Sequence, residues 1–196
     1  IQSGNTGGAF AIDSSTGKIA TAAPIDREVQ SSYNLTIKAE DQGSPSLSST
    51  TNFVIRVIDV NDNAPKLSQS IYKTAVQENT GPGQQLLKFI ATDADEGSNS
   101  VPSFAISSTD FFVNSATGDL YTKSKLDADV GTTSISFTVT ATDVGGLSSQ
   151  ATVFVALIDV NDNAPAFVTL SYTATILESV AVGTQVAQVS PNDPDS

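Results

Sequence analysis

The sequence repeats itself at a spacing of 100 residues, and this repeat constrains the fold more than any other feature. The heptapeptide DVNDNAP occurs at 59–65 and returns unchanged at 159–165, and Glu78 returns as Glu178. A unit of roughly 100 residues is a common size for an independent domain. We therefore expect the later part of one unit at 1–65, a complete unit at 66–165 and the start of a third at 166–196.

The apolar residues in each unit follow the period of a β-strand. Phe137, Val139 and Ala141 alternate with threonines, and Leu35 and Ile37 repeat the pattern in the first unit. Such alternation is typical of strands with one buried face. Short strands at regular spacing, without helical periodicity, predict an all-β chain of tandem, antiparallel, seven-stranded Greek-key sandwiches of the immunoglobulin-like type.

The composition excludes several classes of function. The chain carries 21 acidic and 9 basic residues, a formal charge of −12, so it would be repelled by nucleic acid and by anionic membrane surfaces. It contains neither cysteine nor histidine, which removes the commonest general base and the commonest transition-metal ligand. We expect no nucleic-acid partner, no small-molecule substrate and no enzymatic activity.

The repeated motif NDN on its own is typical of a turn, because Asn and Asp side chains bond to their own backbone. Turns do not need distant carboxylates at matching positions, yet each copy is followed by a glutamate and by an Asp-x-Asp pair. Calcium takes about six to eight oxygen ligands from carboxylates, amides and carbonyls. The all-oxygen donor set disfavours zinc, and magnesium fits crowded protein cages poorly. The pattern therefore favours calcium.

Over essentially its whole length the chain resembles the extracellular repeats of cadherins. The motifs DVNDNAP, ATDADEGSN, IDRE and STGKI occur in the order and spacing of that family. Cadherins bind three calcium ions at each junction between successive repeats, and the resemblance implies two such junctions here, with calcium-binding linkers at 59–63 and 159–163.

The resemblance also implies a ligand set for each junction. For the first junction the two outer ions would use Asp26, Glu28, Asp59, Asp62, Asp95 and the Val60 carbonyl, and the third ion would use Asn61, Asp93, Asp95, Asp143 and the carbonyls of Asn63 and Asn99. For the second junction the outer ions would use Glu78, Asp127, Asp129, Asp159, Asp162, Asp195 and the Val160 carbonyl, and the third ion would use Asn161, Asp193, Asp195 and the Asn163 carbonyl.

The sequence departs from the family pattern in three places. Asp129 stands where the family usually has Glu, so its reach is one methylene shorter. The third repeat ends before the counterparts of Asn99 and Asp143, and the first repeat lacks its opening strands and the counterpart of Glu78. A sandwich without its first strands exposes core and unpaired edges, so we expect the chain to be an excerpt of a longer ectodomain.

The resemblance implies a function in calcium-dependent adhesion at the cell surface, with calcium rigidifying the junctions between repeats. The alternative is that these repeats are internal structural spacers, with recognition located elsewhere. The implied partners are other cadherin-like ectodomains, homophilic or heterophilic. The implied location is extracellular, in the ectodomain of a single-pass plasma-membrane protein tethered through a segment outside this chain. Asn34 opens an N-x-[ST] sequon on a predicted strand and should face solvent, where it could be glycosylated.

Overall fold

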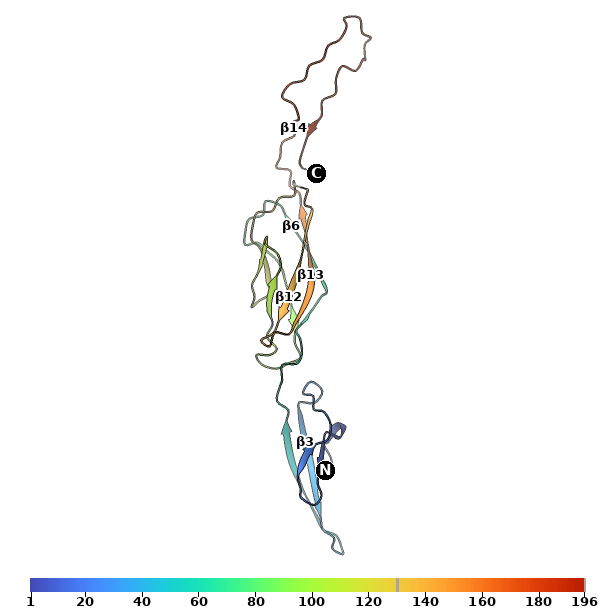
Figure 1. The fold of residues 1–196 in the computed structure, drawn as a ribbon, viewed down its shortest axis with the longest axis vertical. Coiled ribbons are helices and arrows are strands. Elements are labelled where there is room, and N and C mark those ends of the chain that lie inside the picture. Colours follow the sequence, from blue (N-terminus) through green and yellow to red (C-terminus); the bar gives the residue numbers. More distant parts are fainter. Residues whose placement is uncertain (130, 196) are drawn as a thin grey trace. The chain divides into compact units, whose positions relative to one another are not determined.

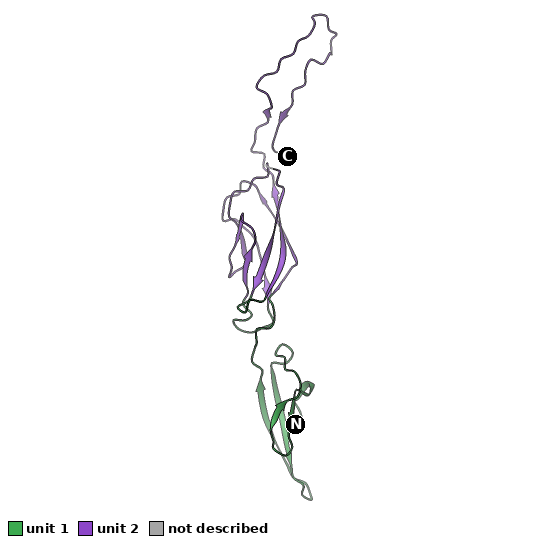
Figure 2. Ribbon diagram, viewed as in Figure 1, with its two compact units in different colours: residues 1–65, 93–101, 143–147 green, residues 66–92, 102–142, 148–196 purple. Residues whose placement is uncertain are grey.

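The computed structural model describes residues 1–129 and 131–195, which divide into two compact units (Figure 2). Unit 1 consists of residues 1–65, 93–101 and 143–147, and unit 2 of residues 66–92, 102–142 and 148–196. Two loops from the second sequence repeat, 93–101 and 143–147, therefore belong to unit 1 together with the whole first repeat.

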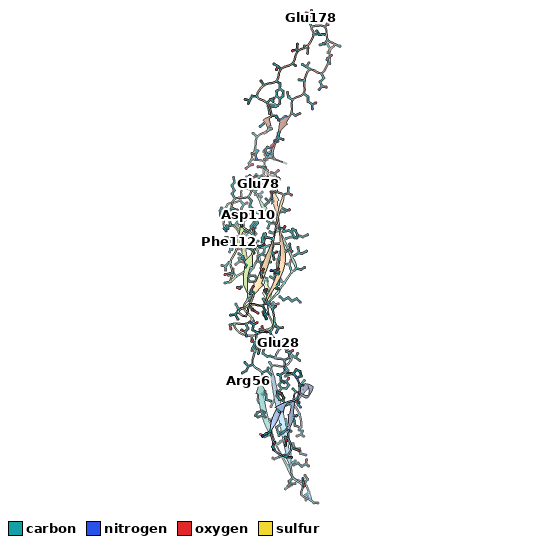
Figure 3. All side chains as sticks on the ribbon, in the orientation of Figure 1. Glu28, Arg56, Glu78, Asp110, Phe112 and Glu178 are labelled. Atoms are coloured by element: carbon teal, nitrogen blue, oxygen red, sulfur yellow. The ribbon has the colours of Figure 1, made fainter. Side chains whose placement is uncertain are left out.

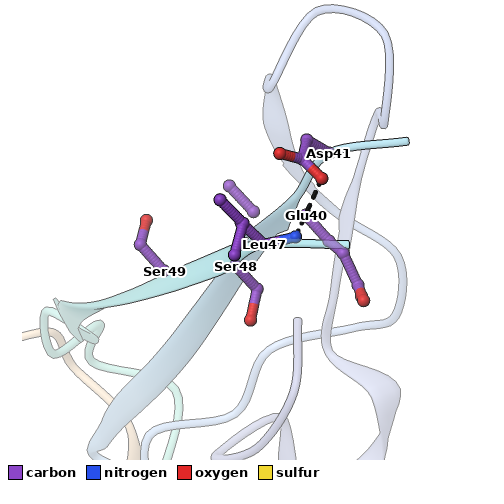
Figure 4. A pocket seen from close by; sticks show the side chains of 6 residues that line it. Glu40, Asp41, Leu47, Ser48 and Ser49 are labelled. Carbon is purple, nitrogen blue, oxygen red and sulfur yellow. Dashed lines mark hydrogen bonds between the residues drawn. The ribbon is translucent and has the colours of Figure 1, made fainter. Parts of the chain in front are cut away.

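Unit 1 is built from two antiparallel strand pairs. The first pair is β1 (Phe10–Ile12) with β2 (Ile19–Thr21), and the second is β3 (Ser32–Glu40) with β4 (Ser48–Arg56). A short 3-10 turn, η1 (Thr6–Gly8), precedes β1. The loop between β3 and β4 is closed by Asp41, whose Oδ1 accepts a hydrogen bond of 2.8 Å from the amide of Leu47 (Figure 4).

The core of unit 1 is small. Phe10, Tyr33 and Leu35 are buried, and the rings of Phe10 and Tyr33 meet edge to face with centroids 5.0 Å apart. Phe53 is 47% exposed, whereas Val153, 100 residues later in the repeat, is fully buried. The difference arises because β4 pairs with β3 alone among the described strands, so one edge of β4 and the adjoining core face stay uncovered.

Unit 2 contains the complete sandwich (Figure 1). One sheet has four strands in the order β6-β13-β12-β9, the other has three in the order β10-β11-β7, and two short pairs flank them. The strands are β5 (Lys66–Leu67), β6 (Ile71–Gln77), β7 (Gln85–Lys88), β8 (Ala91–Thr92), β9 (Ser103–Ile106), β10 (Phe111–Val113), β11 (Asp119–Thr122), β12 (Ser134–Thr142), β13 (Ser148–Ile158), β14 (Ala166–Phe167) and β15 (Pro191–Asn192).

The predicted alternation decides the core of this sandwich. Along β13 every second side chain is buried, and Val153 and Val155 are fully inaccessible. Facing residues of the two sheets interlock through aromatic contacts: Phe111 stacks on Phe137 with centroids 5.3 Å apart. Burial of this continuous apolar layer is the dominant favourable contribution to folding, and it fixes the loops at the ends of the strands.

The sandwich is antiparallel as predicted except for one pair of strands. β6 runs parallel to β13, with Tyr72 beside Val153 and Val76 beside Leu157. This register places the buried side chains of β6 on the same face as those of β13, which extends the apolar layer. An alternating pattern predicts which face of a strand is buried. It does not predict whether the neighbouring strand runs parallel or antiparallel.

Residues 166–195 form an extended hairpin closed by β14 and β15 (Figure 1). Every residue from 164 to 194 is exposed. Tyr172, the counterpart of the buried Tyr72, keeps 45% of its surface accessible and meets Phe167 edge to face. Among the described residues, no helix is long and apolar enough to span a membrane.

Candidate metal centres

The first junction gathers two groups of carboxylates within unit 1. One oxygen each from Glu28, Asp59 and Asp95 lie within 4.8 Å of one another, and so do oxygens of Asp93, Asp95 and Asp143. Asp95 belongs to both groups and is only 5% exposed. A carboxylate shared in this way can bridge two cations, as the sequence-based ligand set requires of it.

Asn63 of the linker positions Asp95. The Asn63 side-chain amide donates to Asp95 Oδ1 at 2.8 Å, and its backbone amide donates to Asp95 Oδ2 at 3.3 Å. The amide of Asp95 in turn donates to Asp93 Oδ1 at 3.1 Å. The side chain of Asn63 thus acts as a donor, which leaves its carbonyl as the group that could bind a metal.

Asn61 lies against the turn that carries Asp143. In the amide orientation that satisfies both atoms of its side chain, Asn61 donates to Asp143 Oδ2 at 2.8 Å and accepts from the amide of Gly145 at 3.1 Å. A Cβ at Gly145 would come within 2.6 Å of the Asn61 side chain, so only glycine permits this close approach.

Arg27, which the sequence reasoning missed, lies inside the first junction. Its guanidinium forms ion pairs with Glu28 (Figure 3), with Asp59 at 2.5 Å and with Glu96 at 2.9 Å. It also donates to the carbonyl of Ala94 at 2.6 Å. The position of Arg27 between two expected ligands, Asp26 and Glu28, was the signal that could have pointed to it.

The charges of this group shift two pKa values in opposite directions. Burial alone would raise the pKa of Asp59, but hydrogen bonds from Asn99, the Glu96 amide and Arg27, with the guanidinium charge, lower it overall. Burial alone would lower the pKa of Arg27, but its hydrogen bond to Asp59 and the neighbouring carboxylates raise it. Both groups are therefore held in their charged forms.

The second junction lies within unit 2 and is organised around Glu78 (Figure 3). Glu78 is 2% exposed, and its two oxygens accept hydrogen bonds from the backbone amides of Ala128 at 2.6 Å and Val160 at 2.8 Å. It lies in a group with Asp127 and Asp129, whose ligand oxygens are within 4.8 Å of one another. One buried carboxylate thus fixes both the 127–129 segment and the linker.

Asp129 joins this group to a second one, made with Asp162 and Asp195. Despite the shorter side chain, Asp129 reaches both groups, and its Oδ2 accepts from the Asn163 side chain at 2.5 Å. Its other oxygen is buried without a hydrogen-bond partner. Burial is the first cause that raises the pKa of Asp129, and the negative charges of Glu78, Asp195 and Asp127 add to it, whereas the Asn163 hydrogen bond opposes it.

The linker of the second junction repeats the bonding of the first. Asn163 donates through its side chain to Asp195 Oδ1 at 2.9 Å and through its backbone to Asp195 Oδ2 at 2.9 Å. Asn79, which follows Glu78, donates to Asp162. The matching contacts of Asn63 and Asn163 arise because the two linkers share an identical sequence.

Other predicted ligands stay outside the four groups as the structure describes them. Asp26 accepts from the amide of Val29 at 3.1 Å, Asn99 donates to Asp59 at 2.8 Å, and Asp193 accepts from the amide of Asp195 at 3.2 Å. The remaining predicted ligands lie on the two linkers and are half-buried or exposed: Asp59, Val60, Asp62, Asp159, Val160, Asn161 and Asn163.

The donor chemistry of both junctions fits a hard cation. The groups consist of carboxylate oxygens, with amide and carbonyl oxygens close by, which calcium prefers and soft metals do not. Among the described residues, Asp93 Oδ2 and Asp129 Oδ1 are buried carboxylate oxygens without a hydrogen-bond partner. Such oxygens are costly to bury unless a cation compensates them.

Comparison with known proteins defines the class of this chain. A model of the cadherin domain matches residues 1–58 and 72–160. The chain is 42% identical over 177 residues to protocadherin gamma-B4 of Homo sapiens, which covers 88% of this chain and 19% of that protein. The chain belongs to the cadherin family, and the predicted resemblance is confirmed.

Solved structures agree with this assignment. A protocadherin gammaB7 structure (EC3-6, cis-dimer) matches with a TM-score of 0.85 at 33% identity, over 96% of this chain and 49% of that chain. Mouse cadherin-23 (EC22-24) matches with a TM-score of 0.84 at 29% identity, over 96% of this chain and 62% of that chain. The predicted tandem immunoglobulin-like sandwiches are therefore confirmed, while the chain spans only 6–19% of the length of the curated relatives.

Proposed function

We propose that this chain is part of a calcium-dependent adhesion ectodomain whose repeats are stiffened by calcium at the two junctions. The observation that supports it most strongly is that each of the two junctions gathers two groups of three carboxylates around one shared aspartate, which is Asp95 in the first junction and Asp129 in the second. Like charges 4 Å apart repel by about 1 kcal/mol in water and about 4 kcal/mol at a protein surface, so a bound cation would stabilise each group.

The residues would act in three ways. The shared aspartates, Asp95 and Asp129, would supply an oxygen to two ions each, and the linker asparagines would keep those aspartates oriented. Bound calcium would supply the positive charge that neutralises the groups and would tie their segments together. We assign the ligands as the sequence-based set given above, and the repeat bounds as 1–65, 66–165 and 166–196.

The substitution Asp129→Asn tests this assignment, because its expected effect on thermal stability differs between chelator and calcium. Because burial and neighbouring carboxylates raise the pKa of Asp129, removing its charge should leave thermal stability in chelator unchanged or higher. In calcium the same variant should lose most of the stabilisation that the ions give, since two groups share this residue. A ligand present at about 100 times its Kd stabilises a fold by about 2.7 kcal/mol.

Asp110→Asn is the matched control. Asp110 lies in the same unit and accepts a hydrogen bond from Ser124 Oγ at 3.3 Å, which an amide oxygen can also accept (Figure 3). Asp110→Asn removes one negative charge, as Asp129→Asn does, but at a residue outside the four groups of carboxylates. Thermal melts followed by circular dichroism should show a full calcium response in this control, and a full response in Asp129→Asn would refute the assignment.

We further propose that the partners are other cadherin-like ectodomains, homophilic or heterophilic, and that the chain is extracellular and has no enzymatic role. One matched structure, that of protocadherin gammaB7, is a cis-dimer, which supports an ectodomain partner. Sedimentation of this chain alone and mixed with cadherin ectodomains, in calcium and in chelator, tests the proposal. Absence of association with every cadherin ectodomain would favour the spacer function instead.

Asn34 is a proposed glycosylation site. It lies exposed on β3, and the following residue, Leu35, is fully buried, so the sequon projects its asparagine to solvent as the alternation predicted. Protein secreted from cultured animal cells should lose mass on glycosidase treatment. Thr36→Ala should abolish the glycan and Thr36→Ser should retain it, whereas an unchanged mass in the wild-type chain would contradict the proposal.

A further inference from the structure

Unit 1 leaves open two strand edges whose counterparts in unit 2 are paired. Among the described strands, β4 pairs with β3 alone and β2 pairs with β1 alone. In unit 2 the counterpart of β4 is β13, which also pairs with β6, and the counterpart of β2 is β11, which also pairs with β7. An edge with free N–H and C=O groups is a template for pairing with another segment. Unit 2 therefore shows which kind of strand fits each open edge of unit 1.

Residues 166–195 repeat the stretch of sequence that fills these two places in unit 2. At a spacing of 100, residues 171–177 correspond to β6 and residues 185–188 correspond to β7. Tyr172 and Ile176 stand at the two positions of β6 that are buried. In the hairpin both are exposed, Ile176 to 54%, and no residue between β14 and β15 lies in a strand (Figure 1). The hairpin thus carries the apolar spacing of a buried strand without a sheet that covers it.

The core face of unit 1 is open where these side chains would pack. Phe53 and Val57 are partly exposed, whereas their counterparts on β13 are buried. β6 runs parallel to β13 in a fixed register, and the same register on β4 would place Tyr172 beside Phe53 and Ile176 beside Val57. A strand added to a sheet edge gains main-chain hydrogen bonds, and alternate side chains supply specificity. Both sets of apolar side chains would lose their contact with water.

We propose that residues 171–188 of one copy of this chain bind the open edges of unit 1 in a second copy and complete its sandwich. Each copy would give one segment and receive another, so the contact is heterologous and allows growth beyond a dimer. Any segment preceding Ile1 that supplied these strands would compete for the same edges. Asp193 and Asp195, the expected calcium ligands, lie outside the pairing segment, so the inference does not rest on bound calcium.

Ile176→Asp tests the segment that is given. It places a carboxylate where the added strand would bury an apolar side chain, which is costly. Thr173→Asp is the matched control, because Thr173 corresponds to Lys73, an exposed residue on the outward face of β6. Both Ile176 and Thr173 are exposed in the hairpin, so neither substitution should disturb the sandwich of unit 2.

Val54→Pro tests the edge that receives. In unit 2 the amide of Thr152 donates to the carbonyl of Ser70, which precedes β6. Asn52 is the counterpart of Thr152, and amides two residues apart point to the same side of a strand, so the N–H of Val54 also faces the open edge. Proline removes this donor, and an edge strand tolerates proline there. Val54→Thr keeps the N–H and is the matched control.

Sedimentation of the intact chain in chelator measures the association. The average mass of the wild-type chain and of both controls should rise with concentration beyond that of a dimer. Ile176→Asp and Val54→Pro should each stay monomeric. An equimolar mixture of these two variants should form dimers and nothing larger, because only the Val54→Pro copy can give the segment and only the Ile176→Asp copy can receive it.

Three results would overturn the proposal. The wild-type chain could stay monomeric at every concentration, which would also be the result if the segment paired within its own chain. The mixture of the two variants could stay monomeric. Association could persist in each variant alone, which would indicate a different contact between copies and would still support the proposed homophilic partner.

Discussion

Thr122→Val should destabilise the sandwich of unit 2 and loosen the loop that carries Glu78. Thr122 is fully buried at the end of β11. Its hydroxyl donates to the carbonyl of Gly81 at 2.8 Å and accepts from the amide of Gln84 at 3.0 Å. Valine has nearly the same shape, so the substitution removes both hydrogen bonds with little change in packing.

The magnitude follows from these two bonds. Each intramolecular hydrogen bond contributes about 0.5–1.5 kcal/mol net, and because Gly81 and Gln84 are exposed, water can partly replace the lost partners. The added methyl group returns up to about 0.8 kcal/mol of hydrophobic burial. We expect a net loss of about 1–2 kcal/mol in the free energy of unfolding. For a domain of this size that corresponds to a fall in Tm of roughly 5–15 °C.

The assay is thermal and urea unfolding followed by circular dichroism, in chelator, so that metal binding does not contribute. The control is Thr152→Val, the same change at an exposed position on β13, which should alter stability by less than about 0.5 kcal/mol. Calcium affinity of the second junction should also fall in Thr122→Val, because the loop following Glu78 is less restrained. Equal stability of the two variants would refute the assignment of Thr122 as the clamp on this loop.

Two further predictions concern unit 1. Gly145→Ala should leave the fold intact, because the three atoms nearest to its Cβ all belong to the flexible side chain of Asn61. The variant should push that side chain away and weaken calcium binding at the first junction in a calorimetric titration. Gly81→Ala, with open space around its Cβ, should not weaken binding, and equal affinities of the two variants would contradict the reasoning. Asp41 accepts backbone hydrogen bonds, first from Leu47, that lower its pKa below the ordinary 3.8 (Figure 4). The ionised Asp41 therefore stabilises the loop fully above pH 3.8, and this effect is lost as the pH falls through the lowered pKa. Amide exchange at Leu47 should accelerate only in strong acid. Acceleration near pH 5 would contradict this prediction.

Much of this architecture was accessible from the sequence, because it depends on local pattern. Alternation along β12 and β13 identified the buried faces, since a strand exposes its side chains to opposite sides in turn. The repeated linker sequence predicted two equivalent junctions, and in both the linker asparagine, Asn63 or Asn163, donates to an aspartate. Residue type alone predicted a hard cation, because a chain without cysteine or histidine offers mainly oxygen ligands.

Tertiary structure decided what depends on chain segments that meet from far apart. β6 pairs in parallel with β13, and the alternation of apolar residues does not predict which strands become neighbours. Glu78 became the organiser of its junction because backbone amides 50 and 82 residues away converge on its two oxygens. Arg27 reached Glu96 for the same reason. A sequence states which groups carry charge, whereas only the folded backbone decides which charges lie close enough to neutralise one another, since Coulomb energy depends on distance and burial.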